Sequence, residues 1–303
     1  MKTGLVAFMC RQGIGLALLF MWATAPAHAE PPVLLGRIVQ TFETFDARQG
    51  IAVDDGHFYA VNNFRITQHA RDGGAPLLQW DGRSDDNGPL VHLDSGVIHK
   101  GRLYAAHSNY PHWPMTSSIE IWEAATLEHI NSISFGIDAG SMTWVDRHGG
   151  HWWGAFGNYD KVQDGQQYPY GETHHTQVVQ MDNDFRVLRR WVYPPELLQR
   201  MRPMSNSGGS WGPDGLLYVT GHDHPEIYVV APPTTGSTMD WLATIEVPGL
   251  NGQGIAWDRS VDSRVLWAIL KEKRHVYRIE IPLIDIARPS EDNRRYPGDF
   301  TQD

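Results

Sequence analysis

Short apolar runs recur along most of the chain, and many end at a turn rich in glycine and aspartate. Short apolar runs bounded by turn residues predict β-strands, and turns such as Asp54-Asp55-Gly56 and Pro213-Asp214-Gly215 predict hairpins between them. Few stretches show the longer apolar period of an amphipathic helix. The pattern therefore predicts an all-β chain of short strands.

Five segments repeat one plan: a small or polar residue, an apolar strand, a turn, and a second strand that carries an aromatic residue. They are residues 48–64, 94–110, 139–159, 207–224 and 252–273. The aromatic residues at the same place in each are Tyr59, Tyr104, Trp153, Tyr218 and Trp267. Most of these repeats begin about 45 residues apart, which is the length of one four-stranded blade. The chain is therefore predicted to be a five-bladed β-propeller.

The fifth repeat lacks an outer strand, because only residues 275–283 follow it as a further strand. We expect the N-terminal residues 34–45 to supply the missing strand, which would close the ring and remove open sheet edges. An open sandwich of short strands is the alternative. The blade-length repeat disfavours it, because sandwiches do not repeat internally at that length.

Residues 1–29 have the layout of a secretory signal peptide. Lys2 and Arg11 precede an apolar run, and the small-residue triplet Ala27-His28-Ala29 follows it. A retained membrane anchor is the alternative, but the run is shorter than the roughly 20 residues that a bilayer requires. The expected domains are the signal peptide (1–29, cleaved), the propeller (30–290) and a C-terminal tail (291–303). The protein is therefore expected to be exported, to a periplasm or to the extracellular space.

Composition narrows the expected partners. Cys10 is the only cysteine and lies inside the predicted signal peptide, so the mature chain has no disulfide. The chain has a net charge of −10, and losing the two basic and no acidic residues of the signal peptide leaves −12. This charge disfavours nucleic acid or an anionic membrane as a partner. A small molecule is the expected partner, and the sequence leaves the oligomeric state open.

Long loops are expected on one face of the propeller only. They include residues 107–118 and 156–175, whereas the hairpin turns of the opposite face are short. Long loops on a rigid scaffold are where sites are usually built, so we predict the site at the mouth of the axis on the long-loop face. Aligned repeats place these substrate-binding candidates there: Gln49, Asn63, Asp94, Asn109, Ser141, Asn158, Tyr159, Gln253 and Lys271. The alternative is that these positions are polar only because a propeller channel is filled with water.

Three histidines, His107, His175 and His222, are expected to converge on this mouth, with Tyr110 beside them as a further catalytic candidate. Imidazole is a metal ligand and a base that works near neutral pH. Together the three would hold one divalent ion, zinc or calcium, and activate a water molecule. Without a metal, the cluster would still supply a general base. An ordinary surface position is the alternative for each histidine.

Two segments resemble repeats of secreted propeller enzymes: QGIAVDDGHFYAV, which starts at Gln49, and NGQGIAWDRSVDSRVLWAI, which starts at Asn251. Across most of residues 34–283 the repeats are similar to those of plant-type glutaminyl cyclotransferases, which are five-bladed, and of metal-dependent gluconolactonase-like lactonases. The lactonase resemblance implies acidic metal ligands on the axis. These would be Asp94 or Asp223, with Asn63, Asn109 or Asn158 beside them.

Two functions stay open at this point. The first is an enzyme that acts on a small polar molecule at the mouth of the axis, as a hydrolase of a lactone or ester or as a lyase or isomerase. The second is a binding propeller without catalysis, for a glycan, a peptide or a partner protein. The aromatic loop at residues 110–114 suits this second function equally well.

Overall fold

The computed structural model describes residues 1, 30–83, 90–137, 139–162, 165–169 and 171–285. The predicted signal peptide beyond Met1 and the predicted tail lie outside the described residues. The compact unit of the chain begins at Pro31. No helix in the described part of the chain is long and apolar enough to span a membrane.

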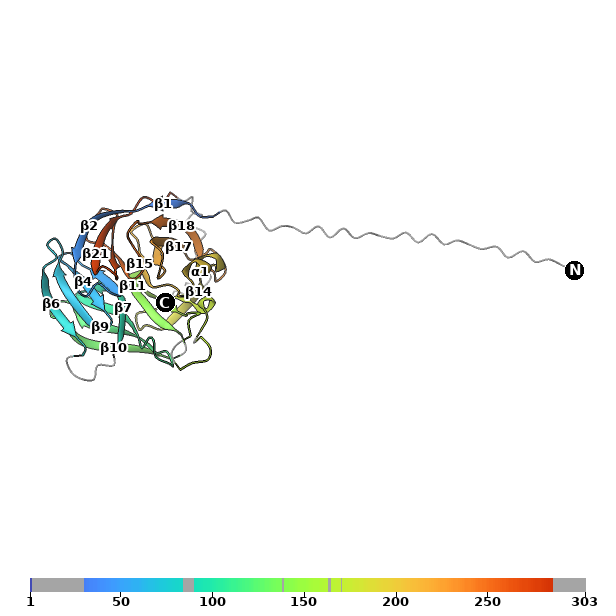
Figure 1. Cartoon of the computed structure of the whole chain (residues 1–303), viewed down its shortest axis with the longest axis horizontal. Coiled ribbons are helices and arrows are strands. Elements are labelled where there is room, and N and C mark those ends of the chain that lie inside the picture. The colour runs from blue at the N-terminus through green and yellow to red at the C-terminus, as the bar shows by residue number, and fades with distance from the viewer. Residues whose placement is uncertain (2–29, 84–89, 138, 163–164, 170, 286–303) are drawn as a thin grey trace, which may run out of the picture. The chain divides into compact units, whose positions relative to one another are not determined.

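Five antiparallel sheets surround a common axis, so the predicted five-bladed β-propeller is confirmed (Figure 1). Blade one consists of β3 (Gly50–Val53), β4 (His57–Asn62), β5 (Arg65–Ala70) and β6 (Pro76–Asp81). Blade two consists of β7 (His92–His99), β8 (Arg102–Ser108), β9 (Ser117–Glu123) and β10 (Glu128–Gly136). Blade three consists of β11 (Ser141–His148), β12 (His151–Gly157), β13 (Gln177–Met181) and β14 (Val187–Val192). Blade four consists of β15 (Gly208–Trp211), β16 (Leu217–Thr220), β17 (Glu226–Ala231) and β18 (Asp240–Glu246). Blade five contains β19 (Ile255–Trp257), β20 (Val265–Leu270) and β21 (His275–Glu280). The inner strands are β3, β7, β11, β15 and β19.

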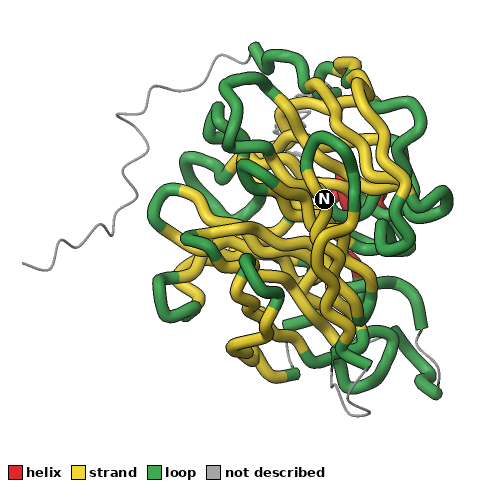
Figure 2. The backbone as a smooth tube through the Cα atoms, turned by 90° about the vertical axis from the view of Figure 1, so that its left-hand side faces the viewer, coloured by secondary structure: helices red, strands yellow, loops and turns green. Residues whose placement is uncertain are grey.

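Helices are a minor part of this architecture, as Figure 2 shows by colour. The described residues form one α-helix, α1 (Pro195–Met201), and one short 3-10 helix, η1 (Thr173–His175). Both lie in the long connections of blade three, before β15 and before β13 respectively.

The N-terminal segment closes the ring as predicted. Strand β2 (Arg37–Glu43) pairs with β21 as the outermost strand of blade five. The sequence did not indicate β1 (Val33–Leu35), which pairs in parallel with β18 and so extends blade four (Figure 1). Gly36 lies at the crossing, where an added Cβ would be 2.9 Å from Cγ2 of Val247. The segment therefore joins two blades, because glycine lets it pass closely over the seam.

The hydrophobic core is divided among the five seams between neighbouring blades. Each seam holds one cluster of buried side chains, for example Tyr218, Trp257 and Leu266 between blades four and five. Phe42 of β2 belongs to the cluster between blades five and one, where its ring stacks on Trp267. Ring closure therefore contributes buried apolar area as well as hydrogen bonds.

The repeated aromatic residue has a structural role that explains its recurrence. In three blades it donates a hydrogen bond to an aspartate in the short-turn region before the second strand. Tyr59 donates to Asp54 (2.7 Å), Tyr218 to Asp214 (2.6 Å) and Trp267 to Asp258 (3.0 Å). Such a bond satisfies the polar end of a buried aromatic ring and fixes the turn.

The inner strands come very close together where blades one, two and five meet. A Cβ on Gly50 would lie 2.6 Å from Cα of Ser95 and 2.7 Å from the carbonyl oxygen of Asp94. A Cβ on Gly254 would lie 2.6 Å from Cα of Gly50. Strand β7 also approaches β15 and β19, which are not its neighbours around the ring. The inner strands of neighbouring blades therefore touch at Gly50 and Gly254, where a larger residue would clash with backbone.

We expect removal of residues 30–45 to lower the free energy of unfolding of the whole domain. The deletion takes away β2 and exposes the edge of β21, and the loss of the buried Phe42 side chain alone costs about 3 kcal/mol or more. Removal of residues 30–35, which takes away β1 only, is the control and should cost less. Urea unfolding measures both, and a shortened chain with the stability of the intact one would contradict closure by β2.

Gly50→Ala should destabilise the propeller by about 1–3 kcal/mol, because the new methyl group meets backbone atoms that cannot move aside. Gly73→Ala is a matched control, since no atom lies within 4 Å of the position of its Cβ. Thermal unfolding of the two variants should separate them clearly. Equal melting temperatures would show that the inner strands can relax.

Candidate active site

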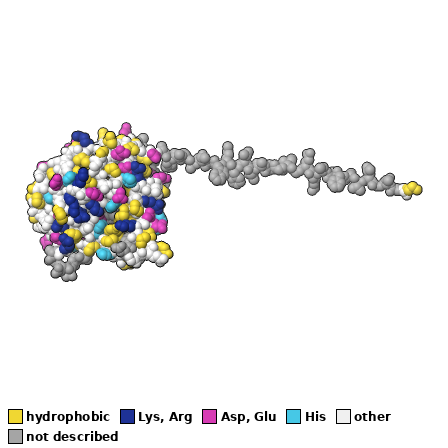
Figure 3. Space-filling view, in the orientation of Figure 1, with side chains coloured by type: hydrophobic (Ala, Val, Ile, Leu, Met, Phe, Trp, Pro, Cys, Tyr) yellow, Lys and Arg dark blue, Asp and Glu magenta, His cyan; other side chains and the backbone are white. Residues whose placement is uncertain are grey.

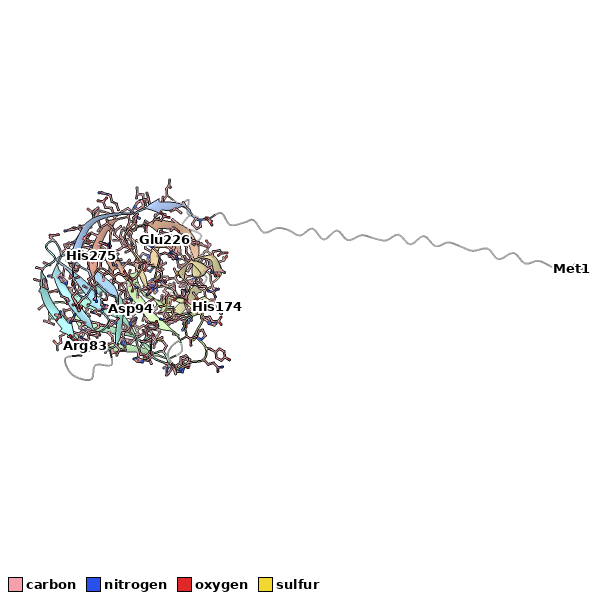
Figure 4. All side chains as sticks on the ribbon, viewed as in Figure 1. Met1, Arg83, Asp94, His174, Glu226 and His275 are labelled. Atoms are coloured by element: carbon pink, nitrogen blue, oxygen red, sulfur yellow. The ribbon has the colours of Figure 1, made fainter. Side chains whose placement is uncertain are left out.

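The inner strands begin at the face that carries the long loops. His92 at the start of β7 is paired with Ser108 at the end of β8, and Ser141 at the start of β11 with Gly157 at the end of β12. The loops that follow β8 and β12 therefore open at the same mouth of the axis. Figure 4 shows Asp94 close to the middle of the ring, whereas Arg83 and His174 lie toward its rim.

Two side chains of β7 form the centre of this mouth. Nε2 of His92 lies 3.6 Å from Oδ2 of Asp94, which is contact but is longer than a hydrogen bond. Asp94 is only 5% exposed, and its Oδ2 atom has no hydrogen-bond partner among the described residues. Buried carboxyl oxygens are usually satisfied by the protein, so this atom is a natural contact point for a ligand.

Burial sets the protonation of this pair. It lowers the pKa of His92 to about 3, and positive charge at His107, Lys271 and His222 acts in the same direction. Burial raises the pKa of Asp94 well above 3.8, although the charge of Lys271 opposes part of the rise. His92 is therefore a neutral imidazole at pH 7, and Asp94 keeps its proton to a higher pH than an ordinary aspartic acid.

Two tyrosines form one wall beside this pair. The Tyr110 ring lies 5.1 Å from the His92 ring and 5.5 Å from the Tyr159 ring, measured between centroids. Tyr159 is hydrogen-bonded to Ser141, and burial raises the pKa of its phenol, so it remains protonated. The structure therefore brings four predicted site residues, Asp94, Tyr110, Ser141 and Tyr159, to one side of the mouth.

Two predicted substrate-binding amides hold backbone in place. The side chain of Asn109 donates to the Pro114 carbonyl (2.8 Å) and accepts from the Thr116 amide (2.7 Å). The side chain of Asn158 donates to the carbonyls of Ala139 (3.3 Å) and His175 (3.2 Å). These bonds fix the loops around the site, and contact with a substrate stays a prediction for both residues.

Three further predicted residues lie in blades one and five. Gln49 donates through Nε2 to Oδ1 of Asn63, so these two side chains satisfy each other. Gln253 has a positive φ of 82°, and its carbonyl accepts a hydrogen bond of 2.5 Å from Thr220. Their role in binding also stays a prediction.

The predicted three-histidine metal site is not formed. Among the described residues, which include His107, His175 and His222, no three His, Cys, Asp or Glu side chains are grouped so as to hold a metal ion. His175 is exposed and packs its ring 4.0 Å from that of His174, measured between centroids. His222 contacts Asp223 through Nδ1 at 2.5 Å. These three histidines therefore do not form the zinc or calcium site expected from the sequence, and a metal centre that uses asparagine side chains, as the lactonase resemblance implies, stays a prediction.

His107 is occupied by structural hydrogen bonds. Its Nε2 accepts from the amide of Val91 (3.2 Å), and its Nδ1 is bonded to Oγ of Ser118 (2.9 Å), which in turn donates to Glu120 (2.5 Å). Burial lowers the pKa of His107 to about 4, partly opposed by Glu120, so its imidazole is neutral at pH 7. His107 therefore holds the chain just before His92 and is best described as a positioning residue.

His92, which the structure brings into contact with Asp94, was not among the residues predicted from the sequence. Strand β7 begins at His92 itself, two residues before the start of the second repeat at Asp94. The available signal was its spacing of two from Asp94, which puts two side chains on one face of a strand. A bulge in the pairing of β7 with β8 follows Leu93 and disturbs that alternation, so their contact could not be read from spacing alone.

A hollow of about 510 Å³ opens among the short turns of the opposite face. Its lining includes Asp54, His57 and Arg259. Here the charged groups have partners: Asp54 accepts from Tyr59 and two backbone amides, and Arg259 forms two hydrogen bonds with Asp146 (2.9 and 2.6 Å). The long-loop mouth is the better candidate for chemistry, because its carboxyl and imidazole groups are buried but less completely satisfied.

No family model and no curated protein sequence matches the chain. Solved structures with a similar fold include three propellers. The PQQ-bound aldose sugar dehydrogenase from Streptomyces coelicolor is 13% identical, with 86% of this chain and 85% of that chain covered and a TM-score of 0.46. A candidate gluconolactonase is 13% identical, with 82% of each chain covered and a TM-score of 0.47. Virginiamycin B lyase from Staphylococcus aureus is 9% identical, with 80% of this chain and 99% of that chain covered and a TM-score of 0.43. At these values the likeness identifies no reaction for this chain.

Alanine substitutions should distinguish the contributions of His107 and His175 to stability. His107→Ala is expected to cost about 1–3 kcal/mol of stability, because it leaves the Val91 amide and the Ser118 hydroxyl without their partner. His175→Ala should change stability by no more than about 0.5 kcal/mol, since the residue is exposed. Chemical denaturation tests both, and an equally stable His107→Ala variant would refute the positioning role.

Proposed function

We propose that this protein is an enzyme that transfers protons to and from a small polar molecule at the long-loop mouth, with His92 as general base and Asp94 as general acid. One observation carries the proposal: a partly buried imidazole and a buried carboxyl group are in contact, and the carboxyl oxygen has no hydrogen-bond partner among the described residues. Such an arrangement weakens the fold, and groups with shifted pKa values in a concave site are typical of catalysis.

The pair can complete a proton cycle by itself. In an isomerase or lyase step, His92 takes a proton from carbon while Asp94 gives its proton to an oxygen of the substrate. In hydrolysis of a lactone or ester, His92 takes the proton of an attacking water and Asp94 protonates the leaving oxygen. Either step leaves an imidazolium and a carboxylate, and a proton that passes from His92 to Asp94 restores both. Tyr110 and Tyr159 are placed to hold the substrate beside the pair.

A binding propeller without catalysis is the second candidate. Its support is the exposure of two aromatic side chains in the long loops, Trp113 at 47% and Tyr168 at 70%. Exposed aromatic rings are common contacts for sugars and peptides, because they combine a large apolar face with a polar edge. Binding of a glycan without any turnover by His92 and Asp94 would favour this candidate.

We further propose that the enzyme acts outside the cytoplasm after cleavage behind Ala29. The support is the order of basic, apolar and small residues in residues 1–29. Mass spectrometry of the protein isolated from the producing cells tests this, because a mature chain should begin at Glu30.

The reaction can be searched for without knowing the substrate. We would incubate the protein in D₂O with a panel of small lactones, esters, hydroxy acids and keto acids and follow the panel by NMR. Exchange of a carbon-bound proton indicates isomerase or lyase chemistry, and ring opening or ester cleavage indicates hydrolysis. His92→Gln should abolish the activity found, whereas His57→Gln, on the opposite face, should preserve it. No turnover in the whole panel, or activity unchanged in His92→Gln, would contradict the proposal.

Asp94→Asn should inactivate the enzyme and stabilise its fold at neutral pH. The pKa of Asp94 is raised in the folded state, so wild-type stability is lost as pH rises from 3.8 through the folded-state pKa. Asparagine does not ionise, and its advantage over aspartate should therefore be larger at pH 7 than at pH 4. Urea unfolding at both pH values measures this, and a variant less stable than wild type at pH 7 would assign Asp94 to the fold rather than to catalysis.

A further inference from the structure

Two of the described histidines are buried, His69 at 3% exposure and His107 at 5%, whereas Figure 3 shows other histidine side chains on the visible surface among acidic and basic groups. Nε2 of His69 contacts the hydroxyl of Thr44 (2.9 Å), and a hydroxyl can either donate or accept. Nε2 of His107 instead receives the backbone N–H of Val91, which only donates. The surroundings of His107 therefore require Nε2 to be without a proton.

The hydrogen bonds of His107 select one neutral form of its ring. Because Nε2 accepts from the Val91 amide (3.2 Å), a neutral imidazole carries its proton on Nδ1. Nδ1 lies 2.9 Å from Oγ of Ser118, and Ser118 donates to the carboxylate of Glu120 (2.5 Å). Each hydrogen bond in this chain thus runs in one direction, from the Val91 amide to Glu120.

His92 lies between two hydrogen bonds that hold the backbone. Before it, the Val91 amide donates to His107, and after it, the amide of Leu93 donates to the carbonyl of Asn63 (2.8 Å). A carbonyl accepts at any pH, whereas an imidazole nitrogen stops accepting when it takes a proton. The Val91 side chain is 39% exposed, so packing holds this residue only weakly. Protonation of His107 would therefore free the chain on the N-terminal side of His92.

We propose that His107 is an acid-sensitive latch. Its neutral ring seats His92 beside Asp94, and protonation at Nε2 releases the chain at Val91. The donor and acceptor geometry carries this inference, because two N–H groups cannot share one hydrogen bond. As a regulation of the candidate site the latch rests on the proposed function, but its opening can be observed without any turnover.

The charged and titratable groups around the latch lie on three strands. Oε1 of Glu120 on β9 lies 3.9 Å from Nδ1 of His107, and His129 on β10 is bonded to the other carboxylate oxygen of Glu120 (2.8 Å). At the start of β7 the titratable residues are His92 and Asp94. Burial lowers the pKa of His107 to about 4, although the charge of Glu120 opposes this change. The latch is therefore closed at neutral pH and opens near pH 4.

The test follows the full protein, labelled with nitrogen-15, by NMR from pH 7 to pH 3. At pH 7 we expect the proton of the His107 ring on Nδ1 and a scalar coupling between the Val91 nitrogen and Nε2 across the hydrogen bond. The coupling should be lost, and the Val91 amide signal should shift, as His107 takes its second proton. His107→Gln keeps a donor and an acceptor but does not titrate, so the shift of Val91 should disappear. His112→Gln, which replaces an exposed histidine in the loop after β8, should keep it.

Three results would overturn the latch: a proton on Nε2 at pH 7, a Val91 shift that persists in His107→Gln, or a Val91 signal that changes only when circular dichroism shows the blades unfolding. If His107→Gln does not fold, the ring tautomer and the coupling in the wild-type protein decide alone. A working latch with no turnover in the substrate panel would refute the proposed enzyme and keep the latch. Turnover by a protein whose Val91 amide does not respond to pH would keep the enzyme and refute the latch.

Discussion

Close contact of the inner strands at the axis is the constraint on which the remaining structure depends. Gly50 and Gly254 let the backbones of β3, β7 and β19 meet where a side chain would clash. This contact restrains the backbone of Asp94, and it limits how far apart the neighbouring blades one, two and five can lie. Because neighbouring blades share each core cluster, the ring needs β2 to complete its last seam.

The two mouths of the axis show how one scaffold separates stability from chemistry. On the short-turn face, aspartates are saturated by tyrosine, tryptophan, arginine and backbone donors, which holds the hairpins in place. On the long-loop face, Asp94 is buried and His92 partly buried, both with fewer partners, and loss of solvent shifts the pKa of each so as to favour its neutral form. Packing in the seams offsets the destabilisation of the fold at this site. The rigid ring also keeps these groups from turning toward water.

The hydrogen-bonded network around His107 supports this arrangement from behind. Glu120 accepts hydrogen bonds from Ser118, Ser132 and His129, and these lower its pKa even though burial acts in the opposite direction. The chain of bonds ends at the Val91 amide, next to His92. A histidine that the sequence marks as a ligand therefore serves to place another histidine, and its own ring nitrogens are not free for a metal.

The sequence by itself determined the fold, because short apolar runs, turn residues and a blade-length repeat are local properties of the chain. The same repeat predicted a site on the long-loop face, with Asp94, Tyr110, Ser141, Tyr159 and Lys271 among its candidate residues, and its role in function stays a prediction. Only the tertiary structure decided which of these side chains meet. The contact of His92 with Asp94, the pairing of β1 with blade four and the failure of the three histidines to form one metal site among the described residues all depend on a strand bulge, on glycine contacts and on packing between blades. Those distances are set by residues far apart in the chain, and no spacing in the sequence encodes them.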